Sequence, residues 1–150
     1  MITTIILDWG RTCYDNENGW LFSETRDILE KLAKKYRLAL VSLVLNGDTE
    51  ARKKVMRDED LERFFEHITF VGADKDAAYE ETLRVLQVRP EEVVMVDDRV
   101  IRGIKWGNKR GATTIWVERG KFAAERPDAS TGEPAHIVKN LGELESILLP

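Results

Sequence analysis

Short apolar runs rich in β-branched residues alternate with apolar stripes of helical spacing, and this alternation restricts the fold more than any other feature of the sequence. Runs typical of buried strands occupy residues 2–7, 38–44, 68–71, 93–96 and 113–117. Stripes typical of helices occupy residues 22–32, 48–61, 76–87, 101–111 and 141–149, and Ser23 and Asp48 are the expected N-caps of the first two. Strands and helices that alternate in this way form a parallel sheet with helices on both faces. We therefore predict an α/β fold, a Rossmann-like three-layer sandwich with a mostly parallel sheet of five or six strands.

Length and cysteine content restrict the remaining possibilities. A chain of 150 residues has the length of one domain, so we expect a single α/β domain spanning residues 1–150. Its one cysteine, Cys13, excludes an intrachain disulfide and is typical of a reducing compartment. The longest apolar run is far shorter than the ~20 residues that span a bilayer, and no segment has the order of a signal peptide. We expect a soluble cytoplasmic protein that binds no membrane.

The charge balance indicates which partners the protein avoids. A formal net charge of −4 is opposite in sign to the basic footprint of a nucleic-acid-binding protein, so we expect no nucleic-acid partner. We interpret the local basic stretch as solvated surface; it consists of Arg99, Arg102, Lys105, Lys109 and Arg110. Charged residues make up 33% of the chain, above the ~25% of an average protein, and this favours a thermophilic protein.

Polar side chains follow the apolar runs, at the edge where a parallel α/β sheet binds its ligands. Asp8 follows the first run, Ser42 lies near the end of the second, and Lys75 comes after the third. The adjacent acids Asp97 and Asp98 follow the fourth run. Phosphoryl transfer to a carboxylate needs a nucleophilic Asp, a divalent cation held by carboxylates, and hydroxyl and ammonium groups that hold phosphoryl oxygens. The sequence therefore predicts a phosphoryl-transfer site at this edge.

Four short motifs carry a resemblance to a known family. In chain order they are IILDWGRT at 5–12, LALVS at 38–42, GADKDAAY at 72–79 and VDDRV at 96–100. With these motifs the chain resembles the haloacid dehalogenase (HAD) superfamily over residues 2 to about 120. Members of that superfamily are mostly Mg²⁺-dependent phosphatases that form an aspartyl-phosphate intermediate. The resemblance implies a HAD-like core and a Mg²⁺-dependent phosphohydrolase acting on a phosphorylated substrate, either a small molecule or a macromolecule.

The resemblance also implies a role for each matching residue. Asp8 is the expected nucleophile, Ser42 and Lys75 are expected to hold phosphoryl oxygens, and Thr12 is expected to order the loop. The expected metal ligands are Asp8, the carbonyl of Gly10, and Asp98, with Asp97 as a further ligand. The residues expected to contact the substrate are Trp9, Gly10, Arg11, Ser42 and Lys75. Several of these roles have a structural alternative. Asp8 could cap the turn after a strand, a buried Ser42 could bond to the backbone, and Lys75 could be an exposed lysine at the start of a helix. Trp9 is equally suited to the core, and Asp97 could face a crossover connection.

Two glycines depart from the family pattern. Gly10 stands where the family has an acid that protonates the leaving group and later activates water, and Gly103 stands where the fourth motif has its second acid. General acid–base assistance contributes roughly 10²- to 10⁴-fold, so its loss weakens catalysis without abolishing it. The alternative is a scaffold that has lost turnover and serves as a phosphate-binding or protein-interaction module. A dehalogenase is disfavoured because those enzymes have an aromatic residue at the Gly10 position. A response-regulator receiver, which is also an α/β domain with a phosphorylated Asp, is disfavoured because its paired acids lie at the first strand. Here the adjacent acids follow the fourth predicted strand.

The spacing of the motifs leaves no room for the cap domain that many superfamily members carry. Only 33 residues separate Asp8 from Ser42, and 32 separate Ser42 from Lys75. We therefore expect a HAD-like core without a cap and with an open site. If the substrate is small, a second subunit is expected to cover the flap at residues 16–21, because water must be excluded from the reaction.

Overall fold

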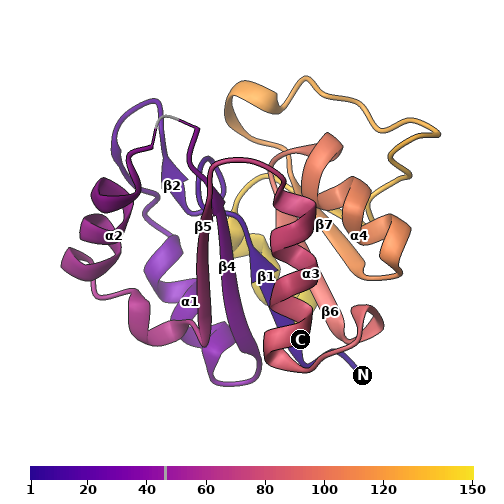
Figure 1. Cartoon of the computed structure of the whole chain (residues 1–150), viewed down its shortest axis with the longest axis horizontal. Helices are drawn as coiled ribbons and strands as arrows, with labels where there is room; N and C mark the ends of the chain where they lie inside the picture. The colour runs from indigo at the N-terminus through magenta and orange to yellow at the C-terminus, as the bar shows by residue number, and fades with distance from the viewer. Residues whose placement is uncertain (46) are drawn as a thin grey trace.

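The computed structural model of this protein describes residues 1–45 and 47–150, and its centre is a sheet of six parallel strands (Figure 1). The strand order is β5-β4-β1-β6-β7-β8. The strands are β1 (Thr4–Leu7), β4 (Arg37–Leu43), β5 (His67–Val71), β6 (Val93–Asp97), β7 (Thr113–Val117) and β8 (His136–Val138). Every pairing in this sheet is parallel, so the carboxyl ends of all six strands lie at one edge.

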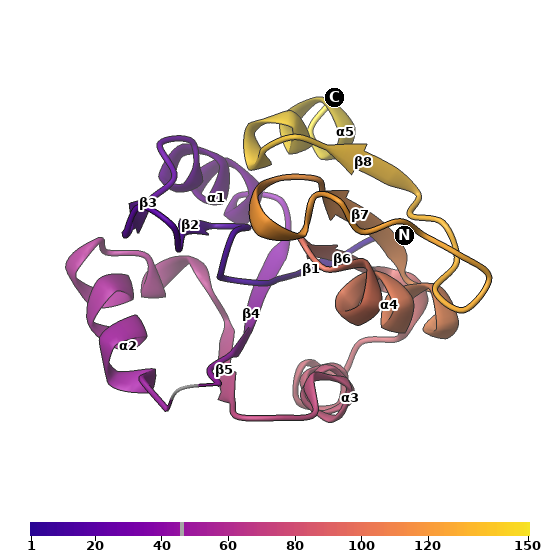
Figure 2. The ribbon, with the colours of Figure 1, turned by 90° about the horizontal axis from the view of Figure 1, so that it is seen from above.

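Helices cover both faces of the sheet, which gives three layers (Figure 2). One face carries α1 (Thr25–Ala33), α2 (Thr49–Asp58) and α5 (Leu144–Leu148), and the other carries α3 (Lys75–Leu86) and α4 (Lys105–Arg110). Short 3₁₀ turns, η1 (Glu62–Phe64), η2 (Pro90–Glu92), η4 (Gly120–Phe122) and η5 (Leu141–Glu143), lie in the connections, and η3 (Val100–Ile104) is a π-helical turn. Within the described residues, no helix is long and apolar enough to cross a membrane.

Strand alternation explains why the central strands are apolar throughout. Ile5 and Leu7 pack into the core cluster under α1 and α5, whereas Ile6 between them packs with Tyr79 and Leu83 of α3. All of these side chains are buried, because successive residues of a strand point to opposite faces and both faces are covered. The predicted α/β three-layer fold is confirmed, and the sheet is wholly parallel.

The sequence-based boundaries are close to the observed ones, with three exceptions. The sixth strand, β8, was not predicted, and neither was the hairpin of β2 (Tyr14–Asp15) and β3 (Trp20–Leu21) within the expected flap. Asp48 caps α2 as predicted, since its Oδ1 accepts a hydrogen bond from the Ala51 amide at 3.3 Å. The prediction of Ser23 as an N-cap is wrong: the N-cap of α1 is Glu24, in a helical conformation and without a capping side-chain bond.

Candidate active site

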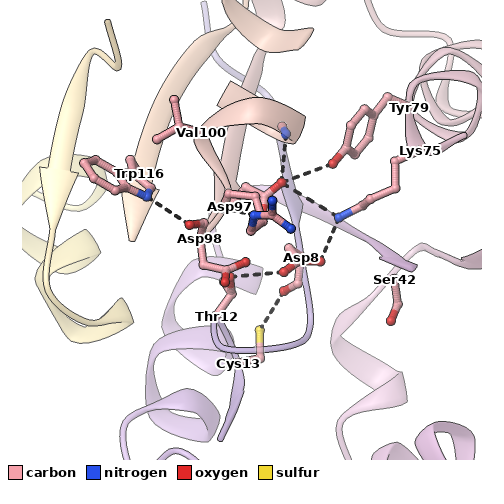
Figure 3. A network of polar contacts seen from close by, with 12 residues as sticks. Asp8, Thr12, Cys13, Ser42, Lys75, Tyr79, Asp97, Asp98, Val100 and Trp116 are labelled. Atoms are coloured by element: carbon pink, nitrogen blue, oxygen red, sulfur yellow. Dashed lines mark hydrogen bonds and ion pairs between the residues drawn. The ribbon is translucent and has the colours of Figure 1, made fainter. Parts of the chain in front are cut away.

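Asp8 and Lys75 form a buried ion pair at the carboxyl edge of the sheet (Figure 3). Asp8 directly follows β1, the central strand, and Lys75 is the first residue of α3. The Nζ of Lys75 donates to Oδ1 of Asp8 at 2.7 Å, and only 4% of the lysine side chain and 11% of the aspartate side chain are exposed. The helix begins at Lys75 because Asp74 caps it, with its Oδ1 accepting from the Ala77 amide. The capped helix therefore fixes the ammonium against the carboxylate.

Asp97, the last residue of β6, belongs to the same cluster. Its Oδ2 lies 3.8 Å from Nζ of Lys75 and accepts hydrogen bonds from the Tyr79 hydroxyl at 3.3 Å and the Gly103 amide at 2.8 Å. Its Oδ1 accepts from the Arg99 amide. The alternative in which Asp97 faces a crossover is wrong, because the carboxylate is fully buried beside Lys75. Tyr79 takes part in this network as well as in the core, although the sequence indicated only its core role.

Asp98 lies beside the other two carboxylates, and one of its oxygens lacks a partner. Ligand atoms of Asp8, Asp97 and Asp98 all lie within 4.8 Å of one another. The Oδ2 of Asp98 is buried, yet it has no hydrogen-bond partner among the described residues. The backbone at Asp98 is held from β7, where the indole nitrogen of Trp116 donates to the Asp98 carbonyl at 3.0 Å. A buried carboxylate oxygen without a partner is costly unless a ligand satisfies it.

Burial and charge shift the pKa values of the three acids in different directions. Burial alone would raise the pKa of Asp8, but the ammonium of Lys75, with further hydrogen bonds from Asp98 and the Trp9 amide, holds the pKa below its usual range. Burial raises the pKa of Asp97, although Lys75 opposes it. Burial and the negative charges of Asp8 and Asp97 raise the pKa of Asp98 to about 10. At neutral pH the metal-free protein therefore has an ionised Asp8 and a protonated Asp98.

This donor set fits a hard divalent cation. Three carboxylates converge, and such oxygens are the ligands that Mg²⁺ prefers in proteins. A bound cation would satisfy the orphaned oxygen of Asp98 and offset the repulsion among the three acids.

Residues of the loop after β1 hold Asp8 in place by hydrogen bonds. The Oγ1 of Thr12 donates to Oδ2 of Asp8 at 3.4 Å, and the thiol of Cys13 donates to the Asp8 carbonyl at 3.3 Å. The carbonyl of Thr12 accepts from Arg119 at 3.0 Å, which ties the loop to the segment after β7. Thr12 and Cys13 are both fully buried. The structure thus places Thr12 against Asp8, and its role in ordering the loop stays a prediction.

The remaining residues of the first motif have different surroundings. Gly10 and Arg11 line the pocket above Asp8, and their contact with a substrate stays a prediction. The side chain of Trp9 packs in the core and stacks on Tyr14, with ring centroids 5.5 Å apart. A Cβ at residue 10 would lie 3.0 Å from Nδ2 of Asn16. The side-chain amide of Asn16 therefore occupies the space next to a side chain at residue 10.

Ser42 is not brought together with the acids. It is fully buried in β4, and its hydroxyl accepts a hydrogen bond from Nη1 of Arg52 at 2.7 Å. In Figure 3 it lies apart from the network around Asp8. Arg52, on α2, reaches the pocket instead and is held in place by Ser42. The sequence did not single out Arg52, because its place over the strand ends depends on how α2 packs.

A pocket of about 320 Å³ opens above the three acids. Its lining consists of Asp8, Gly10, Arg11, Asn16, Leu43, Leu45, Arg52, Lys75, Asp97, Asp98, Arg99, Arg102, Lys121 and Phe122. The interpretation of the basic stretch as solvated surface is wrong for Arg99 and Arg102. Both line this pocket, and the side chain of Arg99 is only 13% exposed in its ion pair with Glu125. Helical spacing could not show this, because Arg99 is extended and precedes the π-helical turn η3, and Arg102 lies in that turn and not in α4.

The sequence profile of the HAD-hydrolase-like family matches residues 70–144, which is half of the chain. The chain belongs to this family. The matched segment includes Lys75, Asp97 and Asp98, three of the four charged groups that meet above the sheet. The prediction of a HAD-like protein is therefore confirmed.

Known relatives of this HAD-like chain agree with the fold. A glyceraldehyde 3-phosphate phosphatase from Pyrococcus furiosus is 36% identical over 76 residues, 47% of this chain and 31% of that protein. The aligned region thus spans about a third of that relative's length. L-2-haloacid dehalogenase from Xanthobacter autotrophicus superposes with a TM-score of 0.82 at 14% identity, over 99% of both chains. A HAD-hydrolase from Bacillus subtilis, solved with bound magnesium, gives 0.70 at 23% identity over 88% of this chain and 58% of that one.

Proposed function

We propose that this HAD-like protein is a Mg²⁺-dependent phosphohydrolase in which Asp8 attacks phosphorus. The observation that carries the proposal is the ionised Asp8 carboxylate, held by Lys75 at the floor of a pocket and flanked by two further buried acids. A carboxylate with a lowered pKa is deprotonated and available as a nucleophile at neutral pH. The named activity of the Pyrococcus furiosus relative, a phosphatase, supports the same reaction class.

Two displacements at phosphorus make up the reaction. In the first, an oxygen of Asp8 forms a bond to phosphorus while the bond between phosphorus and the leaving oxygen breaks, and the leaving oxygen departs as an anion that takes a proton from solvent water. In the second, water attacks the phosphorus of the aspartyl phosphate and gives up a proton to solvent, the bond to Asp8 breaks with the carboxylate restored, and inorganic phosphate leaves. Lys75 and Arg52 are the cations positioned to hold phosphoryl oxygens, and Ser42 positions Arg52. Thr12 keeps the Asp8 loop in place.

Asp8 and Asp98 are the residues that would hold the magnesium ion, together with the Gly10 carbonyl. When bound, such an ion neutralises charge on the phosphoryl group and on the attacking carboxylate. The carboxylate of Asp97 lies beside Gly103, the position at which the family has an acid. A Cβ at residue 103 would lie 2.5 Å from Oδ2 of Asp97, so the Asp97 carboxylate fills the space that a side chain at 103 would need. We therefore assign Asp97 the place of the family acid that Gly103 lacks.

The absence of an acid at Gly10 determines which leaving groups react well. An alkoxide must leave without a proton from the enzyme, whereas a phenolate or an acyl group needs little such help. Aryl and acyl phosphates are therefore the better substrates. The same acid normally activates the water of the second step, so that step is slow and the phosphorylated Asp8 accumulates. The single cysteine supports a cytoplasmic enzyme, and the 33% content of charged residues supports a thermophilic one.

A phosphatase screen with Mg²⁺, Mn²⁺ and Co²⁺ tests this function. Wild type and Asp8→Asn are assayed side by side, with Asp58→Asn as the matched control because Asp58 is exposed and, among the described residues, forms its ion pair with Lys54 of the same helix. We expect metal-dependent turnover of aryl phosphates by wild type and the control, and a loss of at least about 10³-fold in Asp8→Asn. Activity that survives Asp8→Asn would remove Asp8 as the nucleophile. Phosphate binding without any turnover would favour the alternative, a module that has lost catalysis.

A further inference from the structure

The pocket holds more cations than the transfer of one phosphoryl group uses. Its six cationic side chains are those of Arg11, Arg52, Lys75, Arg99, Arg102 and Lys121. Only three carboxylates, those of the acid cluster, line the same pocket. This local excess is opposite in sign to the net charge of −4 on the whole chain. Such a concentration of one charge sign in a cleft attracts ligands of the other sign.

Four of the six cations are already engaged by the protein. Lys75 and Arg52 bind Asp8 and Ser42, and both are assigned to the transferred phosphoryl group. The other two engaged cations are Arg11, paired with Glu17 at 2.7 Å, and Arg99, paired with Glu125 at 3.1 Å. These pairs fix the side chains but leave them little charge to offer a ligand.

Arg102 and Lys121 are different, because in the described part of the chain neither has a carboxylate within ion-pair distance. Arg102 belongs to η3 after β6 and is half-buried, and Lys121 belongs to η4 after β7 and is exposed. Their side chains reach the same pocket because β6 and β7 are neighbours in the sheet. The fold thus places two unpaired cations on the side of the pocket away from α2.

Phe122 holds the segment that carries Lys121. The guanidinium of Arg99 lies 3.6 Å from the centre of the Phe122 ring and that of Arg11 lies 5.1 Å from it, both within the range of cation–π attraction. The Nζ of Lys121 lies 5.4 Å from the same ring. The position of Lys121 at the pocket is therefore supported by packing, which lowers the entropic cost of using it to bind a ligand.

We infer that Arg102 and Lys121 bind a second anionic group of the substrate, so that the substrate is a phosphate monoester that also carries a carboxylate or a second phosphate. The inference rests on the proposed function, because it places the transferred phosphoryl group at Asp8. An uncharged tail would leave both cations without a counter-charge. An anionic tail gains charge-assisted hydrogen bonds from both side chains.

Matched pairs of phosphate esters test the inference. One pair is glycerol 3-phosphate against 3-phosphoglycerate, which differ by a carboxylate, and the other is fructose 6-phosphate against fructose 1,6-bisphosphate. We expect kcat/KM to be at least about tenfold higher for the anionic member of one or both pairs, the size expected for a hydrogen bond between charged groups. The preference should weaken as salt is added. The pair that shows the larger preference identifies the second group as carboxylate or phosphate.

Variants assign the preference to the two cations. Lys121→Met and Arg102→Gln should each reduce the ratio of kcat/KM between the anionic and neutral members, and Lys121→Glu should reduce it further. The controls are Lys109→Met and Arg57→Gln, exposed cations outside this pocket, which remove the same charge and should leave the ratio as in wild type. Circular dichroism of each variant verifies folding.

A binding measurement separates this inference from the proposed function. Calorimetry on Asp8→Asn compares the affinities of the same esters without turnover, and Lys121→Met in that background should reduce the preference for the anionic member. Turnover with equal rates for both members of each pair, or a preference unchanged in both cation variants, overturns the inference and leaves the proposed function standing. If no ester is hydrolysed but the anionic members still bind more tightly through Arg102 and Lys121, the proposed function fails and the anion site remains.

Discussion

At the residue scale, Asp98 is the acid of the proposed metal site whose burial should cost the protein stability. Its pKa of about 10 in the metal-free protein exceeds the ordinary value of 3.8, so the folded state holds a proton that the unfolded state releases. Stability should therefore fall as pH rises from about 4 toward 10. Asp98→Asn keeps the shape and removes the titrating group, and we expect it to melt several degrees higher than wild type at pH 8 in EDTA. For a chain of this size about 1 kcal/mol corresponds to about 2–4 °C.

Added Mg²⁺ should make wild type melt at a higher temperature than Asp98→Asn. Wild type gains thermal stability when Mg²⁺ is added, because the cation takes the place of the proton on Asp98, while Asp98→Asn gains less. Thermal denaturation from pH 6 to 9, with and without Mg²⁺, gives both comparisons. A variant less stable than wild type in EDTA at every pH would show that the buried Asp98 carboxyl carries no such penalty.

Gly10 is the second position where one residue changes the chemistry. Its backbone is not in the left-handed region, so an aspartate meets no conformational strain, and only the exposed Asn16 side chain must move. We expect Gly10→Asp to raise the rate on alkyl phosphates by ~10² or less and to narrow the aryl-to-alkyl ratio. The double variant with Asn16→Ala should gain more, and Asn16→Ala alone should not change the ratio. An unchanged ratio in Gly10→Asp, with no burst phase in wild type, would mean that another group supplies the proton.

At the scale of elements, η3 packs closely against the end of β6, because Gly103 lies directly beside the Asp97 side chain. A methyl group there would lie 2.5 Å from Oδ2 and 2.8 Å from Cβ of Asp97. Gly103→Ala should therefore displace Asp97, destabilise the protein by about 1–3 kcal/mol and weaken Mg²⁺ binding. Gly72→Ala is the control, because the nearest atom that its methyl group would meet in the described part of the chain is the Val44 carbonyl oxygen at 4.0 Å. Urea denaturation and calorimetry measure the two effects, and equal behaviour of both variants would show that Gly103 does not constrain Asp97.

The elements also show what the sequence could predict. Strands β1, β4, β5, β6 and β7 coincide with the apolar, β-branched runs of the sequence, and the polar residues that follow these runs include Asp8, Lys75, Asp97 and Asp98. The short strand β8 escaped prediction because Ile137 is 52% exposed and no apolar run marks it. Arg52 and Lys121 escaped because α2 and η4 bring them to the pocket only in the folded chain. The sequence indicated a core position for Tyr79. Only its position one helical turn after Lys75 indicated that it lies near the acid cluster, where its hydroxyl donates to Asp97.

At the scale of the whole molecule, the open pocket leads to a prediction about assembly. Trp20, in the hairpin at residues 14–21, is 62% exposed, and Leu45 at the pocket wall is 74% exposed. If the substrate is a small molecule, we propose that a second copy of the chain covers residues 16–21 and excludes water from the site. Light scattering should then give a dimer or a larger oligomer, and Trp20→Lys should weaken it. A strict monomer that turns over a small sugar phosphate efficiently would contradict this proposal.

The central claim is that the phosphoryl group passes through Asp8, and trapping the intermediate tests it most directly. The protein is mixed with an aryl phosphate and Mg²⁺, quenched in acid within milliseconds to seconds, and examined by mass spectrometry of the intact chain and of its peptides. We predict one phosphate per chain, labile to base and to hydroxylamine, located on Asp8 and absent from Asp8→Asn. Turnover with no trapped phosphate, or a phosphate on any other residue, would contradict the account.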